Sequence, residues 1–450
     1  MAREQTRRQW LKTAAAAGTA STLGLAGCTD GGNGNGGGSA EGTVKIGLMQ
    51  PLTGDVQYYG QQSLWGFLSG MAYKYDQDPL DVSTSGEETI EADDVTYELY
   101  VEDSQFSPDQ AQTLATDLVQ DQEVDMLCGI ASSDGARRVI DVAKQAGVPY
   151  LAGPAAAADL TSDSELCGEQ IFRASENTAM DARSGGRYVA QETDVERVFI
   201  MAADYSFGRA VARNYKNVLE SEGIEIVGER YVPRGHDQFG GLFENAVEAN
   251  ADAVIGGFTV VTLPNFLDEG LSGEYGLRMF GGFATEISTA AIGGVAERVL
   301  GDLTAEKIQD ALLGPFTSRY HWNQYDNEIN SAFVDAYTST YGKVPDLFTS
   351  GMFAAASSIA QAVEAGGSTD GADIASEMRG MTIAETPKGE DAYTYQEYNN
   401  QARSEMTVAY PVPNTEDNWD APIMPGEPLA RISADETTLP EDSSEMGCSL

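Results

Sequence analysis

From residue 44 onward, short apolar runs alternate with amphipathic stretches along the chain. The apolar runs predict strands at Val44–Met49, Tyr97–Val101, Val124–Gly129, Tyr150–Leu151, Val198–Ala202, Ile224–Tyr231 and Ala253–Phe258. The amphipathic stretches predict helices at Gly60–Tyr75, Pro108–Gln120, Gly135–Ala146, Gly208–Glu222, Phe239–Ala249, Glu328–Tyr341 and Met352–Ala365. Two successive strand–helix series indicate an α/β fold of two doubly wound lobes with parallel sheets.

The first 28 residues are typical of an export signal rather than of a folded element. Paired arginines, Arg7 and Arg8, precede a short run of Ala, Gly and Leu, and the run ends in Leu25-Ala26-Gly27-Cys28. The twin arginine resembles a Tat signal, and the four final residues resemble a lipobox. We therefore expect residues 1–27 to be removed and Cys28 to carry a lipid. Residues 28–42, rich in Gly, are expected to form a flexible tether.

Composition narrows the choice of partners. The chain has 450 residues, with 27 Lys and Arg against 70 Asp and Glu, a formal charge of −43. Such acidity argues against nucleic acid, because binding to its phosphates needs a cationic surface. A dispersed acidic excess is typical of proteins kept soluble in high salt, where ions screen the self-repulsion. We therefore expect a halophilic source of haloarchaeal type, the alternative being an ordinary acidic secreted protein.

Four cysteines are too few for a disulfide framework. Cys28 is assigned to the lipid. Cys128 ends an apolar run and is expected to be a buried thiol. Cys167 in a polar loop and Cys448 near the C-terminus are the expected disulfide, and three free thiols are the alternative. Only two histidines are present, so we expect no His-rich metal site, no Ser-His-Asp triad, no metal and no cofactor.

Small and aromatic residues follow the predicted strands. In open α/β sheets ligands bind at the carboxyl ends of the strands, so these loops are the candidate site. They read Gln50–Gly54, Gly129–Ser133, Ala152–Ala155, Ala203–Gly208, Gly256–Thr259 and Gly281–Ala284.

The ordered series of these segments resembles the type I periplasmic binding proteins of branched-chain amino acid and amide ABC transporters. The resemblance covers about residues 43–415. It rests on Ile46–Gly54, Ser132-Ser133, Ala146–Pro149, Phe172-Arg173, Asp204–Gly208 and Asn400-Gln401.

The resemblance implies two lobes joined by three hinge crossings. By position, lobe 1 is expected to comprise residues 43–173 and 319–400, and lobe 2 residues 174–318 and 401–424. Residues 425–450, rich in Pro, Asp, Glu and Ser, are expected to form a surface tail.

The resemblance also implies the residues that line the ligand cleft. Carried over by position, they are Tyr59, Ser132, Ser133, Pro154, Ala156, Tyr205, Phe207, Phe258 and Phe283. Ser133 would hydrogen-bond the ligand, helped by amides at the start of the following helix, where a carboxylate is favoured. Each aromatic residue could instead belong to the core, and Ser132-Ser133 could simply cap the helix.

At two positions the chain departs from the amino-acid binders of this family, and both positions bear on the chemical class of its ligand. Amino-acid binders of the family usually have Thr where this chain has Ala156, and an acidic residue where it has Phe283. A buried ammonium without its carboxylate is costly, which disfavours an α-amino acid. Glu286 could replace the acid only if its loop turned inward. The remaining cleft suits a small, partly apolar or aromatic carboxylate, or a neutral amide.

The predicted function is therefore that of an extracytoplasmic solute-binding lipoprotein of an ABC importer. Its lobes would close around a small solute and deliver it to permease subunits. We expect a monomer, attached to the membrane only through its lipid. A sensor that reports to a signalling partner is the alternative, and an enzyme such as an amidase is disfavoured.

Overall fold

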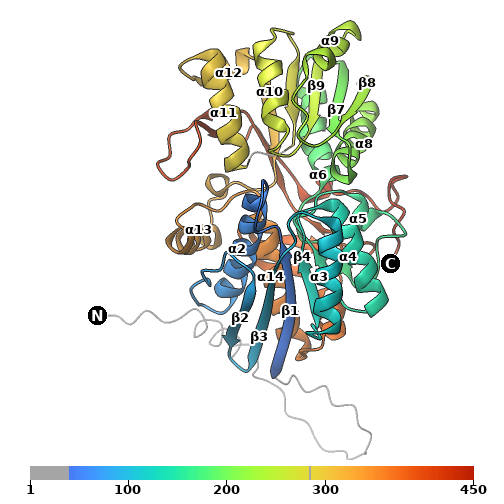
Figure 1. Cartoon of the computed structure of the whole chain (residues 1–450), viewed down its shortest axis with the longest axis vertical. Coiled ribbons are helices and arrows are strands. Elements are labelled where there is room, and N and C mark those ends of the chain that lie inside the picture. The colour runs from blue at the N-terminus through green and yellow to red at the C-terminus, as the bar shows by residue number, and fades with distance from the viewer. Residues whose placement is uncertain (1–39, 283–284) are drawn as a thin grey trace, which may run out of the picture.

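Two α/β lobes stacked end to end make up the molecule (Figure 1). The computed structural model describes residues 40–282 and 285–450. The predicted signal peptide (1–27), Cys28 and nearly all of the predicted tether lie outside the described residues. Within the described part, no helix is both long and apolar enough to cross a membrane.

Lobe 1 is built on a six-stranded sheet of order β2-β3-β1-β4-β5-β6. Its strands are β1 Gly42–Gln50, β2 Gly86–Ala92, β3 Val95–Asp103, β4 Met126–Gly129, β5 Tyr150–Ala152 and β6 Ile171–Phe172. The helices on its faces are α2 Gln57–Lys74 and α14 Thr349–Gly366 on one side, and α3 Pro108–Gln120 and α4 Ser133–Ala146 on the other. Helices α2 and α14 come very close because α2 carries glycines. A Cβ on Gly66 would lie 2.5 Å from the carbonyl oxygen of Thr349.

Lobe 2 is built on a seven-stranded sheet of order β18-β15-β11-β10-β9-β7-β8. Its strands are β7 Arg197–Ala203, β8 Glu225–Val232, β9 Ala253–Gly257, β10 Arg278–Gly281, β11 Leu313–Ser318, β15 Met406–Ala409 and β18 Ala430–Ile432. Its helices include α6 Thr178–Asp181, α7 Arg187–Glu192, α8 Ser206–Ser221, α9 Gly240–Glu248, α10 Leu263–Ser272, α11 Glu286–Leu300 and α12 Ala305–Asp310. The hairpin of β16 (Pro411–Pro413) and β17 (Ile423–Pro425) lies against α11 and α12.

Local sequence explains where the helices of lobe 1 begin and end. The Ser107 side chain accepts a hydrogen bond from the Gln110 amide, and Pro108 occupies the first turn of α3. Ser132 caps α4 in the same way, and Gly147 ends α4 with φ of 71°. These boundaries place the start of α4 directly after the carboxyl end of β4.

The two-lobe α/β architecture is as predicted, with differences at the sheet edges. Strand β2 pairs antiparallel with β3, and β15 and β18 run antiparallel in lobe 2. Lobe 1 also contains a small sheet of β12 (Thr382–Thr386), β13 (Gly389–Tyr395) and β14 (Ala402–Arg403). Because β14 pairs with β13, the chain stays in lobe 1 through Arg403, so the third crossing follows Arg403 rather than residue 400.

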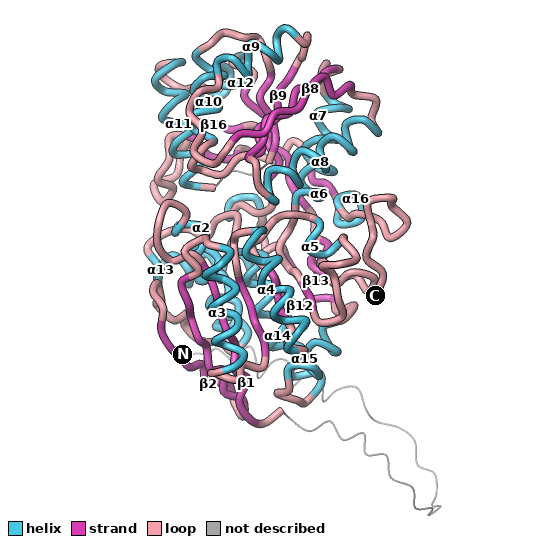
Figure 2. Tube along the Cα trace, turned by 45° about the vertical axis from the view of Figure 1, so that its right-hand side comes forward, coloured by secondary structure: helices cyan, strands magenta, loops and turns pink. Residues whose placement is uncertain are grey.

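The expectation that residues 425–450 form a surface tail also differs from the structure. Residues 425–450 are not only a tail, because β18 forms the edge strand of the lobe 2 sheet. The chain then continues through the short α16 (Ala434–Thr437) and ends against lobe 1 (Figure 2). There Cys448 forms a disulfide with Cys167, and its amide donates to the Ser162 carbonyl. The thiol of Cys128 is free and buried.

The crossings between the lobes lie side by side and are buried. The main chain of Arg173 exchanges hydrogen bonds with the residues on either side of Gln401. The Arg173 guanidinium is fully buried and donates to the Gln401 side chain and to carbonyls after β5. Burial lowers its pKa to about 9. The neighbouring ion pair of Arg319 with Asp181 is also almost inaccessible to solvent.

Candidate functional site

A pocket of about 370 Å³ lies between the lobes, at the carboxyl ends of β1, β3, β4, β5, β7 and β9. Its lining side chains are largely aromatic or small. They are Tyr59, Phe106, Ala131, Ser133, Pro154, Ala156, Tyr205, Phe207, Thr259 and Phe348. No charged residue is among these described lining residues, which makes the pocket apolar with a few hydroxyl groups.

Six of the nine residues expected in the cleft lie together in this pocket. They are Tyr59, Ser133, Pro154, Ala156, Tyr205 and Phe207. Tyr59 comes from α2, Ser133 from the start of α4, and Phe207 from the start of α8. The pocket is therefore built from helix starts and loops of both lobes, as its position at the strand ends requires.

Ser133 and Tyr59 are held so that each can donate a proton into the pocket. The Ser133 hydroxyl oxygen accepts a hydrogen bond from the Ala157 amide at 3.1 Å. The Tyr59 hydroxyl oxygen accepts one across the lobes from the Val260 amide at 3.0 Å. A hydroxyl that accepts from an amide keeps its own hydrogen for another acceptor. Burial raises the pKa of Tyr59 well above its usual range, so Tyr59 remains protonated.

Charges of both signs lie near the pocket, namely Arg234, which pairs with Asp55 at 4.0 Å, and the carboxylates of Asp346 and Asp134, which act on Tyr59 and Tyr205 respectively. The Arg234 guanidinium of lobe 2 lies 5.2 Å from the centre of the Phe106 ring of lobe 1. Burial raises the pKa of Tyr205, while the charge of Arg234 acts in the opposite direction on both Tyr205 and Tyr59. The field of Arg234 therefore reaches the pocket although its side chain does not line it.

Two of the remaining expected residues, Ser132 and Phe258, are not among the lining residues. The Ser132 side chain caps α4 by accepting from the Gly135 amide at 3.3 Å. Phe258 was expected in the cleft and is not among the residues that line this pocket. Its ring is buried in the core of lobe 2, with ring centroids 5.4 Å from both Phe239 and Phe266. The ring is stabilised there because it exchanges water for aromatic contacts. Phe283 lies outside the described residues.

Glu286 is not available to hold an ammonium group in the pocket. Its carboxylate pairs with Lys343 of lobe 1 at 2.8 Å, and Glu286 is not among the lining residues. The loop does not turn this acid inward, because its backbone and its carboxylate are both held by lobe 1.

Phe106 and Phe348 complete the pocket and were not expected from the sequence. Phe106 follows the carboxyl end of β3, so the rule that ligands bind at strand ends could have found it. Phe348 comes from the loop before α14, far along the chain, and packs edge-on against Tyr59 at 4.8 Å. Nothing in the local sequence around Phe348 distinguishes it from a core residue.

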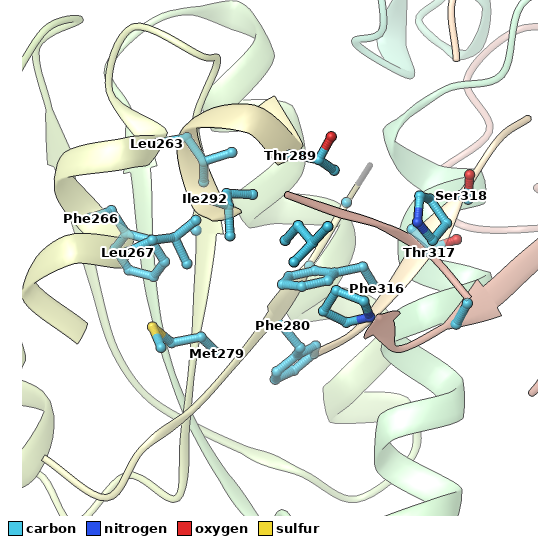
Figure 3. A pocket seen from close by; sticks show the side chains of 17 residues that line it. Leu263, Phe266, Leu267, Met279, Phe280, Thr289, Ile292, Phe316, Thr317 and Ser318 are labelled. Carbon is cyan, nitrogen blue, oxygen red and sulfur yellow. The ribbon is translucent and has the colours of Figure 1, made fainter. Parts of the chain in front are cut away.

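A second, larger pocket of about 640 Å³ lies inside lobe 2 (Figure 3). Large apolar side chains dominate its lining, among them Leu263, Phe266 and Ile292. The hydroxyls at its edge are engaged within the protein, as when Thr289 donates to the carbonyls of Thr285 and Glu286. Among its described lining residues only Thr289, Thr317 and Ser318 have polar side chains, and only one lobe contributes, so the cleft pocket is the better candidate site.

Comparison with known proteins decides the family. Residues 43–415 match the family described as periplasmic binding protein. The chain belongs to this family. In it, a solute captured between two lobes is passed to an ABC importer outside the cytoplasm, and this is the function of the chain.

Individual relatives of this periplasmic binding protein differ in what they bind. The chain is 24% identical to the leucine-, isoleucine-, valine-, threonine- and alanine-binding protein of Pseudomonas aeruginosa, over 77% of this chain and 84% of that protein. It superposes with a TM-score of 0.71 on an amino acid transporter substrate-binding protein of Pseudomonas fluorescens, at 20% identity, covering 92% of this chain and 100% of that one.

A third relative carries a different ligand. The solute-binding protein of an ABC transporter from Rhodopseudomonas palustris, in complex with 3,4-dihydroxybenzoic acid, has a TM-score of 0.69 and 20% identity. The match covers 87% of this chain and 98% of that one. The structural likenesses show the two-lobe fold.

Proposed function

We propose that the solute of this binding protein is a small aromatic carboxylate. The observation that carries the proposal is the lining of the cleft pocket. Five of its ten side chains are aromatic, namely those of Tyr59, Phe106, Tyr205, Phe207 and Phe348. Rings on several sides favour a flat, apolar body on the solute.

The polar groups of the pocket suit an acceptor rather than an ammonium. Ser133 and Tyr59 offer hydroxyl protons, and Ser133 is the first residue of the 14-residue helix α4. A helix N-terminus with a hydroxyl donor favours a carboxylate. The carboxylate that an α-amino acid needs for its ammonium is absent from the described lining. A related fold with a bound dihydroxybenzoic acid supports the same class of solute.

A thermal-shift screen of the purified chain in molar KCl tests the solute class. The panel contains benzoate, 4-hydroxybenzoate, aliphatic carboxylates, benzamide, leucine and phenylalanine. We expect the aromatic carboxylates to stabilise the protein, by about 2.7 kcal/mol at one hundred times the Kd. Stabilisation by leucine or phenylalanine, and not by the carboxylates, would overturn the proposal.

Two variants separate binding from folding in this screen. Ser133→Ala removes one hydroxyl donor from the pocket and should reduce the ligand-induced shift. Phe258→Leu, in the core of lobe 2, should lower the melting temperature without ligand and leave the shift caused by the ligand intact.

We also propose that the protein is exported with its twin-arginine signal and anchored through a lipid on Cys28. Arg7, Arg8 and the sequence Leu25-Ala26-Gly27-Cys28 support this proposal. The charge of −43 supports a halophilic, haloarchaeal-type source. Action as a monomer fits an isolated two-lobe receptor.

A further inference from the structure

The N-terminus of helix α11 in lobe 2 is held by one carboxylate of lobe 1. Asp346 lies in the loop between α13 (Glu328–Tyr341) and α14. Its Oδ2 accepts hydrogen bonds from the Glu286 amide and from the Tyr58 hydroxyl, each at 2.7 Å. Asp346 itself is completely buried. One oxygen atom therefore joins α2 of lobe 1 to the first residue of α11 of lobe 2.

A second contact at the same place strengthens this junction. The Lys343 ammonium, three residues before Asp346, pairs with the Glu286 carboxylate at 2.8 Å. Lobe 1 thus holds Glu286 by both its backbone and its side chain. The Asp346 amide in turn donates to the Gln62 side chain at 3.1 Å, which fixes the loop on α2.

We propose that Asp346 is a positioning residue that fastens α11 to lobe 1 and so sets how stable the closed form of the receptor is. It does not line the solute pocket. It acts through α11, which follows the loop at the carboxyl end of β10. The proposal rests on the two-lobe capture of a solute, but not on the chemical class of that solute.

Opening the lobes would break the contact and expose the carboxylate. The Glu286 amide would lose its acceptor, and Asp346 would gain water. A ligand that contacts both lobes binds through the closed form, so any change in closure appears in its affinity.

Because Asp346 is buried where it meets lobe 2, the contact between Asp346 and the Glu286 amide should depend on pH. Burial is the main cause that raises the pKa of Asp346 to about 7, opposed by hydrogen bonds from Tyr58 and from the Glu286 and Leu347 amides. Charged and titratable groups face Asp346 from each surrounding element, namely Tyr58 and Tyr59 of α2, Tyr320 after β11, Tyr337 of α13, Glu286 of α11, and its partner Lys343.

Proton linkage gives the direction in which closure of the lobes changes with pH. Hydration in the open form returns the pKa of Asp346 toward its usual value near 4. The closed form then binds the extra proton, so closure is favoured below pH 7 and weakens as the pH rises through 7. Between pH 6 and pH 8 the closure constant should fall by up to about tenfold.

Hydrogen exchange of the solute-free full chain tests this without a known ligand. A peptide spanning residues 281–292 reports the Glu286 amide, because Glu286 lies beyond its first two residues, and its protection is corrected for the intrinsic exchange rate at each pH. We expect protection to fall between pH 6 and pH 8 in the unmodified protein. In Asp346→Asn, which cannot ionise, protection should be independent of pH.

Two further variants, Asp346→Ala and Asp125→Asn, test whether the protection of residues 281–292 depends on Asp346. Asp346→Ala leaves the Glu286 amide without its acceptor and should reduce protection about tenfold at both pH values. Asp125→Asn is the matched control, because Asp125 also accepts a main-chain amide, that of Lys45 at 2.7 Å, but entirely within lobe 1. Burial raises the pKa of Asp125 as well, yet its variant should keep the pH dependence at residues 281–292.

The proposal is overturned if Asp346→Asn keeps the pH dependence, or if Asp346→Ala folds and protects residues 281–292 as the unmodified protein does. Benzoate affinity, measured at pH 6 and pH 8 on the same variants, should follow the exchange data. If benzoate binds at neither pH, the proposed solute class fails, while the exchange comparison still tests Asp346.

Discussion

At the scale of single residues, hydroxyl donors and one nearby cation define the polarity of the pocket. Ser133 and Tyr59 have their oxygen atoms occupied by amides, which directs their protons elsewhere. Arg234 lies at the edge, over the Phe106 ring, and provides positive charge without a direct contact. These groups together favour an anion whose body is apolar.

Replacing Arg234 tests whether charge contributes to recognition. In Arg234→Gln we expect affinity for benzoate to fall two- to fivefold, about 0.5–1 kcal/mol, because the lost cation is partly exposed and screened by salt. Affinity for neutral benzamide should not change. Isothermal titration in the same buffer measures both.

Arg209→Gln is the control for that experiment. Arg209 also lies over an aromatic ring, that of Tyr231 at 4.8 Å, and pairs with Asp204 outside the pocket. Equal losses for benzoate and benzamide, or an equal loss in Arg209→Gln, would show that Arg234 does not act through its charge on the solute.

Residue roles could be predicted where position along a strand or helix fixes them. Ser133 follows β4 and starts α4, so its place at the cleft follows from chain order. Phe258 directly follows β9, yet its ring turns into the core, and sequence alone does not give the direction of a side chain at a strand end. Phe348 reaches the pocket from a loop that only the tertiary packing brings there.

At the scale of elements, hydrophobic runs predicted several strands, including the edge strand β8, but neither the edge strands β2 and β18 nor the central strands β10 and β11. β9 is a short run of apolar residues and glycines, and the second half of β1 is buried and mostly apolar, as burial in a parallel sheet requires. β2 (Gly86–Ala92) is largely exposed and polar, and β18 (Ala430–Ile432) is only three residues long, with Arg431 exposed and its two neighbours half-buried. Edge strands that face water carry little hydrophobic pattern, so β18 could not be separated from a tail.

The Cys167–Cys448 disulfide fixes the end of this C-terminal segment. Cys448→Ser should lower the free energy of unfolding by about 2–5 kcal/mol, because the unfolded chain regains the freedom of the open loop. Guanidinium unfolding at constant KCl measures the change. Benzoate affinity should stay the same, because neither cysteine lines the pocket. An unchanged unfolding midpoint would contradict this expectation.

At the scale of the whole molecule, the crossings between the lobes bury several charged side chains. Arg173 is enclosed, and its guanidinium donates to main-chain carbonyls and to the Gln401 side chain. The Lys388–Glu176 and Arg319–Asp181 pairs are equally enclosed. Removing one partner of such a pair leaves a buried charge, which costs about 3–5 kcal/mol. The lobes therefore meet at a joint whose buried charges are paired or hydrogen-bonded within the protein.

The proposed membrane attachment concerns the molecule as a whole and has its own test. In cells, Cys28→Ser should move the protein from the membrane fraction to the soluble fraction, since the lipid is the expected anchor. Cys128→Ser is the control, because Cys128 is a buried free thiol of lobe 1. Mass spectrometry of the N-terminal peptide should show an added lipid on Cys28. A membrane-bound Cys28→Ser protein would contradict the proposal.

The disulfide of the C-terminal segment also changes the covalent topology of the receptor. It closes a ring between Cys167 and Cys448, which are 281 positions apart in the sequence, and this ring contains all three crossings and the whole of lobe 2. A protease that cuts once anywhere inside the ring releases no fragment, and the nicked protein separates into pieces only after reduction. The two lobes are thus secured against the loss of either one by a single cleavage outside the cell.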